Sequence, residues 1–343
     1  MHKIVVPRAG SYDRLRLEEH PMPQPGPGEA LVEVEASGVN YADVVVRMGL
    51  YASARTYVGW PITPGFEVAG RIRDVGSGVD DLKPGEPIIG VTRFGGYASH
   101  LVIPRAQIFR RPKGWSAEQA AGFPSVFLTA YYALHELAHP RSGARILVHS
   151  AAGGVGGALL QLGRIAECWQ IGVVGSSHKR STATELGADV VIDKSVERLW
   201  RSVEQHAAEG LDVIFDANGV ATLRQSYRHL APTGRLVVYG FHSMLPRKGG
   251  RPRWLKLAWD WLRTPRFNPL DLTNDNRSVL AFNLSYLFDR LDLLDEGMSE
   301  LLRWAEAGQV RPLPTKSYPL ADVARAHRDI ESGRTVGKLV LVP

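Results

Sequence analysis

The sequence predicts an α/β protein that combines a doubly wound parallel sheet with a separate β-rich region. Between residues 145 and 239, short apolar runs alternate with segments of helical character. Such alternation builds a parallel sheet whose crossover connections are right-handed. Residues 1–120 instead hold short β-type runs between clusters of Pro and Gly, which indicates a barrel-like antiparallel arrangement. With 343 residues, the chain is long enough for two domains.

The expected elements follow from these patterns in chain order. In the β-rich region, the β-type runs lie at 30–35, 67–75 and 87–92. Ser116 and Gln119 have the spacing of a capping box and therefore begin a helix. The alternating region then gives strands at 145–150, 171–175, 190–193, 213–216 and 235–239, with helices at 156–167, 179–186, 196–209 and 222–230. Beyond an Arg- and Trp-rich stretch at 241–275, with helical spacing at 254–262, we expect a strand at 279–287, helices at 300–307 and 322–332, and strands at 315–318 and 338–342.

Composition excludes several classes of protein. A chain with one cysteine, Cys168, forms no internal disulfide and no zinc site of several thiolates. The first residues lack the apolar core of a signal peptide, and no run approaches the roughly 18 apolar residues of a membrane span, so a cytoplasmic location is expected. The net charge of +6 would suit nucleic acid or an anionic membrane. Because no nucleic-acid motif accompanies that charge, no nucleic-acid partner is expected.

The strongest motif follows the strand at 145–150, where residues 151–156 read AAGGVG and open a helix. Gly153 takes the position at which the backbone approaches a pyrophosphate, and Gly156 the position at which helix and strand pack closely. Backbone amides at a helix start also favour negative charge. We therefore expect a dinucleotide here, the alternative being a Gly-rich turn without a ligand. The loop residues assigned to the cofactor are Ala152, Gly153, Gly154, Val155 and Gly156.

The end of the second strand indicates which dinucleotide binds. An NAD site carries an acidic residue about 20 positions beyond the glycine loop, but residues 175–180 read GSSHKR. The hydroxyls, Lys179 and Arg180 suit a 2′-phosphate, because charge-assisted hydrogen bonds to phosphate oxygens are strong, and Ser176 and Lys179 are assigned to it. The expected cofactor is therefore NADPH. The alternative is that Lys179 and Arg180 only begin a solvated helix.

Several motifs resemble those of the medium-chain dehydrogenase/reductase superfamily, and within it the zinc-free quinone oxidoreductases. They are NYAD at 40–43 with RMGLY at 47–51, PGFEVAG at 64–70, LTAY at 128–131, the 151–156 loop and GKLVL at 337–341. The segment 239–287 is similar to the VAT-1-like branch, which carries a comparable Trp- and Arg-containing insertion. Lys194 departs from the family pattern, since quinone reductases have a tyrosine there, and this leaves the adenine-side contact open.

The resemblance implies a particular domain organisation and assembly. A Rossmann domain, residues 123–287, is expected as an insertion in a GroES-like catalytic domain made of residues 1–122 and 288–343. Substrate is expected in the cleft between the domains, at the carboxyl ends of the strands. The resemblance also implies a homodimer, with edge strands around 281–287 pairing into a continuous sheet.

The chemistry expected of this chain does not use a metal. Zinc-dependent relatives bind zinc with a Cys in the segment that reads SGVN at 37–40 here, a His at the position of Phe66, and a Cys or Asp in the segment that reads FPS at 123–125. The ligands that zinc requires are therefore absent from the sequence. Without a Lewis acid, the alkoxide of a simple alcohol is hard to stabilise. A quinone or an α,β-unsaturated carbonyl spreads the charge over its π-system, so orientation and a few donors suffice. The expected reaction is direct hydride transfer from NADPH to such an acceptor.

The resemblance also assigns roles to single residues. Asn40 would face the nicotinamide, Asp43 and Arg47 would organise the cleft, and Tyr51 would donate to the acceptor oxygen. For Asp43 and Arg47 an internal salt bridge is the alternative. Further cofactor candidates are Asn218, Tyr239, Asn283 and Lys338, and Lys338 could instead merely flank the last strand. Among the histidines, His242 is an open proton-donor candidate, whereas His135, His139 and His149 are expected in surface, capping or packing roles.

The basic and aromatic segment 247–263 leaves a second class of function open. An amphipathic helix of this composition can lie on an anionic membrane, which would make the segment a peripheral membrane contact. The alternative is a lid or dimer-contact helix. Two further functions stay open: a membrane-associated nucleotide-binding protein with little turnover, and an enoyl-thioester reductase.

Overall fold

The computed structural model describes residues 1–343 and divides into two compact units. The first unit contains residues 1–128, 247–251 and 284–343, and the second contains residues 129–246 and 252–283. The second unit thus interrupts the first in sequence. The short segment 247–251 belongs to the first unit, although it lies within the part of the chain expected to form the Rossmann domain.

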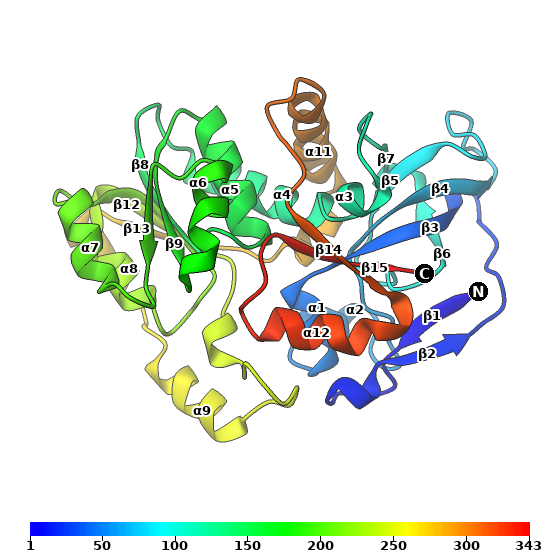
Figure 1. Ribbon diagram of the computed structural model, residues 1–343, viewed down its shortest axis with the longest axis horizontal. Helices are drawn as coiled ribbons and strands as arrows, with labels where there is room; N and C mark the ends of the chain where they lie inside the picture. Colours follow the sequence, from blue (N-terminus) through cyan, green and yellow to red (C-terminus); the bar gives the residue numbers. More distant parts are fainter. The chain divides into compact units, whose positions relative to one another are not determined.

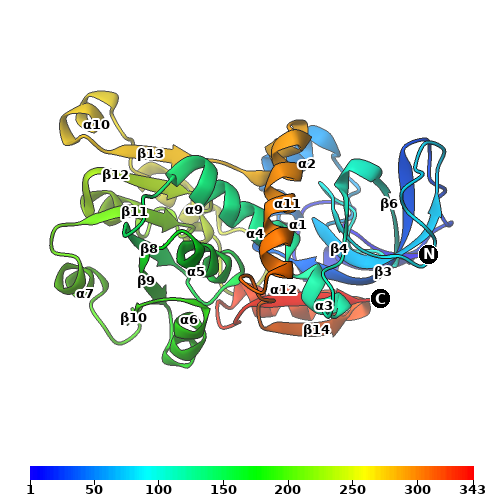
Figure 2. The ribbon, with the colours of Figure 1, turned by 90° about the horizontal axis from the view of Figure 1, so that it is seen from above.

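The second unit is built on a six-stranded parallel sheet with the order β10-β9-β8-β11-β12-β13, seen in this order in Figure 2. Its strands are β8 (Arg145–His149), β9 (Trp169–Val174), β10 (Val190–Asp193), β11 (Leu211–Asp216), β12 (Leu230–Val238) and β13 (Ser278–Ala281). The chain runs outward from β8 to β10, then returns to β11 on the other side of β8. This reversal is the switch point of a Rossmann fold, so the predicted fold class is confirmed.

Helices connect these strands, as the alternating pattern predicted. They are η3 (Tyr132–Ala138), α5 (Gly154–Ile165), η4 (Ser177–Lys179), α6 (Arg180–Leu186), α7 (Leu199–His206), α8 (Leu223–Arg228), η5 (His242–Met244), α9 (Trp254–Arg263) and α10 (Pro269–Asp275). The strands are rich in apolar residues because both faces of the sheet are covered. Leu147, Ile171 and Ile214, from three neighbouring strands, are fully buried in one core cluster.

The first unit contains a seven-stranded sheet, in which β14-β15-β3-β4-β5-β7 pair in succession and β6 pairs with β3. All of its pairings are antiparallel except β14 with β15. The strands are β3 (Glu29–Val39), β4 (Glu67–Val75), β5 (Pro87–Val91), β6 (His100–Pro104), β7 (Ile108–Arg110), β14 (Thr315–Pro319) and β15 (Lys338–Val342), beside a separate pair, β1 (His2–Val5) and β2 (Arg16–Glu19). Alternate residues of β3, such as Ala30, Val32 and Val34, enter the core.

Most helices of this unit are short, and α11 is the longest with 16 residues (Figure 1). They are η1 (Tyr12–Arg14), α1 (Tyr41–Arg47), α2 (Ala52–Tyr57), η2 (Arg105–Gln107), α3 (Ala117–Ala121), η6 (Leu284–Asp289), α11 (Leu291–Glu306), η7 (Leu320–Asp322) and α12 (Val323–Glu331), while α4 (Pro124–Tyr131) spans the division between the units. The predicted capping box is confirmed: Gln119 N donates to Ser116 Oγ at 3.2 Å and Ser116 N to Gln119 Oε1 at 3.0 Å.

Two expected elements differ from the structure. The run 279–287 is not one strand, because β13 ends at Ala281 and a 3-10 helix begins at Leu284. The helix expected at 300–307 begins earlier, at Leu291, and buries Leu294, Met298 and Leu301 at helical spacing. None of the helices has the length and apolar character needed to cross a membrane.

Candidate functional site

The glycine loop of the second unit joins β8 to α5. Gly153 is the N-cap of α5, and the helix begins at Gly154. A Cβ at Gly156 would lie 2.3 Å from the carbonyl oxygen of Ser150, so any side chain there would force α5 away from the end of β8. Gly153, Gly154 and Val155 remain half-exposed. The loop therefore presents backbone amides at the start of a 12-residue helix, the arrangement that binds an anion.

Asn218 lies beside this loop, just after β11, because β8 and β11 are neighbours at the switch point. Ser150 Oγ donates to Asn218 Oδ1 at 3.5 Å, and Asn218 N donates to Asp216 Oδ1 at 2.7 Å. Asn218 is 2% exposed, yet its Nδ2 has no hydrogen-bond partner. A buried amide donor without a partner costs free energy on the order of 1–3 kcal/mol. The donor and the glycine loop together fit the polar groups of a dinucleotide.

The Asp216 carboxylate holds the segment after β11 in place. Its Oδ2 accepts hydrogen bonds from Thr222 Oγ1 at 2.7 Å and from Ser226 Oγ at 2.9 Å. His149 Nε2 lies 3.2 Å from Ser226 Oγ and 3.7 Å from the same Asp216 oxygen. Burial lowers the pKa of His149 to about 4, although Asp216 opposes that shift. His149 is therefore a neutral packing residue, as expected.

The residues expected at a 2′-phosphate lie in the turn after β9. Ser176 is half-buried at the N-cap of η4, and Lys179 is 9% exposed. Ser177 Oγ donates to Asp193 Oδ2 at 2.6 Å, so a carboxylate from the end of β10 braces this turn. Asp193 was not among the predicted site residues, because it ends the third strand of the unit and not the second. Arg180 pairs with Glu197 at 2.8 Å.

Three further candidates of the second unit lie near the ends of β12 and β13. Tyr239 and Asn283 are half-buried. Burial, with the Asp216 charge, holds the pKa of Tyr239 above its usual range. His242 Nδ1 lies 2.8 Å from the carbonyl oxygen of Ala217, which fixes the orientation of its ring.

In the first unit, Asn40 belongs to a buried cluster with Glu67 and Lys338. Asn40 Nδ2 donates to Glu67 Oε1 at 2.8 Å, and Lys338 Nζ donates to Glu67 Oε1 at 2.7 Å and to Asn40 Oδ1 at 2.8 Å. Lys338 also donates to Val39 O at 3.1 Å, and Ser125 N donates to Glu67 Oε2 at 2.7 Å. Lys338 is 2% exposed and its three N–H donors all have acceptors. This geometry favours a structural role for Lys338 over contact with a ribose.

Glu67 was not among the predicted site residues. It is fully buried and orients Asn40, the residue assigned to the nicotinamide. The sequence does contain a pattern that could have identified it: Glu67 is the one charged residue in the run GFEVAG, where β4 enters the core. A carboxylate in such a run requires buried partners.

Asp43 is also buried, on α1. Its carboxylate accepts hydrogen bonds from Asn40 N and Gly65 N, both at 2.8 Å, and from the Tyr97 hydroxyl. Burial raises the pKa of Asp43 to about 7, although these donors and the Lys338 charge oppose the rise. Asp43 therefore fixes the backbone on which Asn40 stands.

A hydrogen-bonded chain continues from Tyr97 to Arg47. Arg47 Nη1 lies 3.1 Å from His327 Nδ1, and because arginine only donates, that nitrogen is the acceptor. His327 Nε2, at 3.3 Å from the Tyr97 hydroxyl oxygen, then carries the proton. Burial, together with the Arg47 charge, lowers the pKa of His327 well below its usual value. His327 is therefore neutral.

Arg47 forms an internal ion pair, but its partner is Glu331 and not Asp43. Its Nη2 donates to Glu331 Oε1 at 2.7 Å, and neither side chain is exposed. Further donations reach Gly250 O at 3.1 Å and Gly10 O at 3.3 Å. With no exposed surface, Arg47 is poorly placed to bind a substrate. The geometry favours this structural pair with Glu331 over contact between Arg47 and a substrate.

Tyr51 lies in an aromatic group at the start of α2. Its ring contacts Phe66 edge-to-face at a centroid distance of 5.8 Å and Phe94 at 6.4 Å. Phe66, at the position where zinc-dependent relatives have a histidine, is thus a packing residue. Tyr51 is half-buried, so part of it remains accessible.

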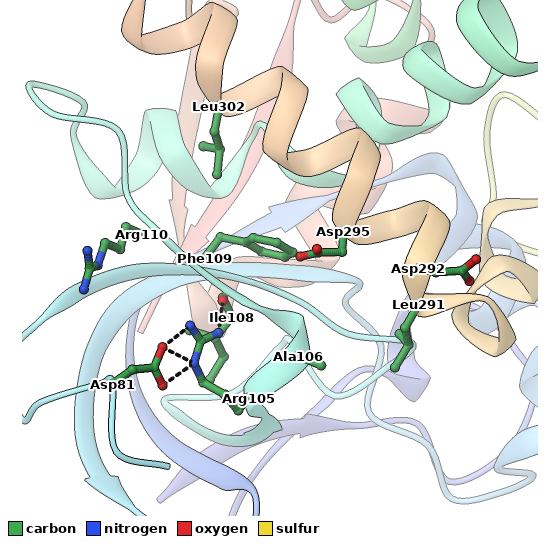
Figure 3. A pocket seen from close by; sticks show the side chains of 10 residues that line it. All are labelled: Asp81, Arg105, Ala106, Ile108, Phe109, Arg110, Leu291, Asp292, Asp295 and Leu302. Carbon is green, nitrogen blue, oxygen red and sulfur yellow. Dashed lines mark hydrogen bonds and ion pairs between the residues drawn. The ribbon is translucent and has the colours of Figure 1, made fainter.

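The structure contains two open cavities, and neither is lined by the predicted site residues. No group of three or more His, Cys, Asp or Glu could hold a metal ion, and His139 ends η3 in the left-handed conformation. A cavity of about 660 Å³ in the first unit lies between α11 and the η2–β7 segment, where Arg105 pairs with Asp81 (Figure 3). Another, of about 460 Å³, lies between α8 and α10 in the second unit. None of the predicted site residues lines either cavity.

Comparison with known proteins decides the family. Residues 26–113 match the alcohol dehydrogenase GroES-like domain, and residues 186–341 match a family described as zinc-binding dehydrogenase. The chain is 32% identical over 342 residues to the synaptic vesicle membrane protein VAT-1 homolog of Rattus norvegicus, covering 99% of this chain and 83% of that protein. The chain belongs to the VAT-1-like branch of the medium-chain dehydrogenase/reductase superfamily. The predicted family and the GroES-like and Rossmann folds are confirmed.

Solved structures extend the likeness of this VAT-1-like chain. The quinone oxidoreductase of Escherichia coli, complexed with NADPH, is 28% identical with a TM-score of 0.86, and the match covers 100% of both chains. The CurK enoyl reductase is 26% identical with the same TM-score of 0.86, covering 99% of this chain and 98% of that one. The neighbours of this VAT-1-like chain thus include both a quinone reductase and an enoyl reductase.

Proposed function

We propose that this VAT-1-like protein is an NADPH-dependent oxidoreductase that reduces quinones or α,β-unsaturated carbonyls without zinc. The observation that carries the proposal is the Gly153–Gly156 loop beside the unpaired Asn218 amide at the switch point of the sheet. The E. coli quinone oxidoreductase with the same fold is complexed with NADPH. Bound NADPH would supply the hydride, and the protein would supply binding and orientation.

The second unit would hold the cofactor. The amides of residues 152–156 would bind the pyrophosphate, and the Asn218 amide would donate to a neighbouring polar group. Ser176 and Lys179 would bind the 2′-phosphate, with the Ser177–Asp193 hydrogen bond holding their turn. Tyr239 and Asn283 complete the set of residues proposed for this unit.

The first unit would supply the polar groups for the reacting end. The Asn40 side chain, held at both its oxygen and its nitrogen by the Lys338–Glu67 pair, would face the nicotinamide in a fixed orientation. Tyr51 would donate to the acceptor oxygen. Conjugated acceptors suit such a site because the charge that develops on hydride transfer is spread over their π-system and needs only a few oriented donors.

A second candidate function is enoyl-thioester reduction. It is favoured by the CurK enoyl reductase, which has the same fold and a similar level of identity. The two functions share the cofactor and differ in the acceptor. Turnover of different substrates can therefore distinguish the two functions, whereas cofactor binding cannot.

The test begins with binding and proceeds to turnover. NADPH and NADH are titrated against the protein, and NADPH oxidation is then followed with an ortho-quinone, a medium-chain alkenal and an enoyl thioester, with controls for quinone redox cycling. Tighter binding of NADPH, weakened at least tenfold in Asn218→Ala, and turnover of quinone or alkenal are expected. Turnover of the thioester alone would support the second candidate. Absence of NADPH binding would overturn the proposal, and binding without turnover would favour a nucleotide-binding protein with little turnover.

A separate variant tests the preference for NADPH over NADH. In Ser176→Ala/Lys179→Ala, affinity for NADPH should fall while affinity for NADH changes little, because only NADPH carries the 2′-phosphate. Arg180→Ala is the matched control, since Arg180 in the same turn is exposed and paired with Glu197. An equal loss for both cofactors would contradict the assignment of the turn to the 2′-phosphate.

A further inference from the structure

Four buried polar side chains of the first unit form one hydrogen-bonded chain that ends at Asp43. Asp43 and Arg47 belong to α1, and His327 belongs to α12. Tyr97 lies between β5 and β6. None of the four side chains is exposed. Because an unpaired polar group costs free energy when it is buried, the positions of the protons along this chain are restricted.

Arg47 sets the direction of the hydrogen bonds along the chain. A guanidinium only donates, so His327 Nδ1, at 3.1 Å from Arg47 Nη1, accepts, and the single ring proton of the neutral histidine is on Nε2. That proton points to the Tyr97 hydroxyl oxygen, 3.3 Å away. The Tyr97 hydroxyl in turn donates to the Asp43 carboxylate. Each hydrogen bond thus runs toward Asp43, which must accept at the end of the chain.

The other hydrogen bonds of Asp43 also come from donors. Asn40 N donates to Asp43 Oδ2 and Gly65 N donates to Asp43 Oδ1, both at 2.8 Å. The bond from Asn40 N is one half of the capping box with which α1 begins. An ionised carboxylate can accept from all three donors, whereas a protonated one must itself donate. Protonation of Asp43 would therefore leave its O–H facing donors only and loosen the backbone at Asn40.

Burial and the surrounding groups act on Asp43 in opposite directions. Burial raises the pKa of Asp43, whereas the three donors and the Lys338 charge on β15 lower it. Glu67, the other buried carboxylate of this region, is paired with Lys338 at 2.7 Å. The result is a pKa of about 7 for Asp43, so the loss of one donor should be visible at neutral pH.

We propose that Tyr97 and His327 are positioning residues for hydride transfer. Being fully buried, they act through Asp43, whose ionised form holds the backbone of Asn40 in place. With that backbone fixed, the Asn40 side chain faces the nicotinamide in one orientation, as hydride transfer requires. When Asp43 gains a proton, this order is lost and hydride transfer slows. The inference rests on the proposed function, because it takes the nicotinamide contact of Asn40 from it.

The first measurement is the rate of hydride transfer as a function of pH. Single turnovers of bound NADPH with a saturating quinone or alkenal are followed from mildly acidic to mildly alkaline pH. NADPH deuterated at the transferred position identifies hydride transfer as the observed step. In the original protein the rate should rise with a midpoint near pH 7. In Asp43→Asn it should be slow and independent of pH.

Tyr97→Phe removes the last donor of the chain. Since a hydrogen bond to a charged group favours the charged form about tenfold to a hundredfold, the midpoint should rise by about one to two pH units. The rate at pH 7 should then fall by about five- to fiftyfold and recover at alkaline pH. Tyr318→Phe is the matched control, because Tyr318 also donates to a carboxylate, that of Asp329, outside the chain. Its midpoint should equal that of the original protein.

His327 is tested by two variants that differ in hydrogen bonding. His327→Gln keeps an acceptor for Arg47 and a donor for Tyr97, so it should retain most of the original midpoint. His327→Leu keeps neither, and its midpoint should rise, by less than that of Tyr97→Phe because Tyr97 can still donate. A structural defect alone would lower the rate at every pH. Hydrogen exchange of peptides from β3 shows whether the first unit of each variant is folded.

An infrared titration follows Asp43 without any turnover. The carbonyl band of protonated Asp43, identified by its absence from Asp43→Asn, should appear with the same midpoints as the rate. An unchanged midpoint in Tyr97→Phe, or a loss of rate that does not recover at alkaline pH, would overturn the proposal. Absence of turnover in the original protein would instead contradict the proposed function, and the infrared midpoints would still test the control of Asp43 by Tyr97.

Discussion

Replacing Lys338 by methionine tests the buried cluster around Asn40. Lys338 is 2% exposed, Glu67 is fully buried, and Lys338 Nζ lies 2.7 Å from Glu67 Oε1. In Lys338→Met, the Glu67 carboxylate keeps the donors from Asn40 and Ser125 but loses its counter-charge. Removing one partner of a buried ion pair costs about 3–5 kcal/mol, because an uncompensated charge is left in a low-dielectric interior. The methionine fills most of the lysine volume, so the cavity contribution is small.

The assay must report on the first unit alone, because a chain of two units need not unfold in one step. Native-state hydrogen exchange of peptides from β3 and β15 satisfies this requirement, since amide protection follows the free energy of local opening. A loss of about 3–5 kcal/mol lowers the protection by roughly two to four powers of ten. Peptides from β8 and β11 in the second unit should keep their protection.

A matched control and a double variant make the result decisive. Lys316→Met removes an exposed ion pair on the neighbouring strand β14, where Lys316 Nζ lies 3.0 Å from Asp329 and is 55% exposed, so the cost should be about 0–1 kcal/mol. Glu67→Gln/Lys338→Met leaves no unpaired charge and should recover most of the lost protection. Protection within tenfold of the original protein in Lys338→Met, or no recovery in the double variant, would refute the electrostatic reasoning.

Four further predictions concern other parts of the chain. In Gly156→Ala, the added Cβ would lie 2.3 Å from Ser150 O and should displace α5. A fluorescence titration should then show much weaker NADPH binding than in Gly114→Ala. Equal NADPH affinities of the two variants would contradict the close packing of α5 on β8. Because the pKa of His149 is lowered to about 4, the second unit should lose stability as the pH falls from 6.5 to about 4. In His149→Gln, the unfolding free energy from urea denaturation should depend less on pH over this range. An unchanged pH dependence would exclude His149 as the group responsible. The raised pKa of Asp43, about 7, has the opposite effect, so the stability of the first unit should fall as the pH rises from about 4 to 7. In Asp43→Asn, the hydrogen exchange of β3 peptides should no longer show this fall. A fall that persists in the variant would point to another titrating group. We propose that the edge strand β13 pairs with its copy in a homodimer; Leu280→Pro should then give a monomer in light scattering, whereas a monomeric original protein would contradict the pairing.

The parallel sheet was predictable because its signals are local. Each apolar run in 145–239 is followed within a few residues by a helix, and the observed strands β8 to β12 all overlap the predicted ranges. β4 begins and ends where the alternating pattern at 67–75 does. The capping box at Ser116 is equally local, since both of its hydrogen bonds join residues three apart.

The buried ion pairs were not predictable, because their partners are far apart in the sequence. Lys338 and Glu67 are separated by 271 residues, and Arg47 and Glu331 by 284. No periodicity links such positions, and only the pairing of distant strands brings them together. The extent of β13 was missed for another reason: the apolar residues of 279–287 fit a strand and a short buried helix equally well.

The pairing of β15 with β3 also has a consequence for how the chain acquires its structure during synthesis. Residues 129–283, which contain all of the second unit, leave the ribosome before β15 is made. During this time β3 lacks the neighbouring strand β15, which in the finished protein places Leu339 opposite Val39. The edge of β3 that β15 will cover is therefore an open template while some three hundred residues are translated, and open strand edges invite aggregation. The insertion of one unit into the other thus leaves this strand edge of the nascent chain exposed to aggregation until the last strand emerges.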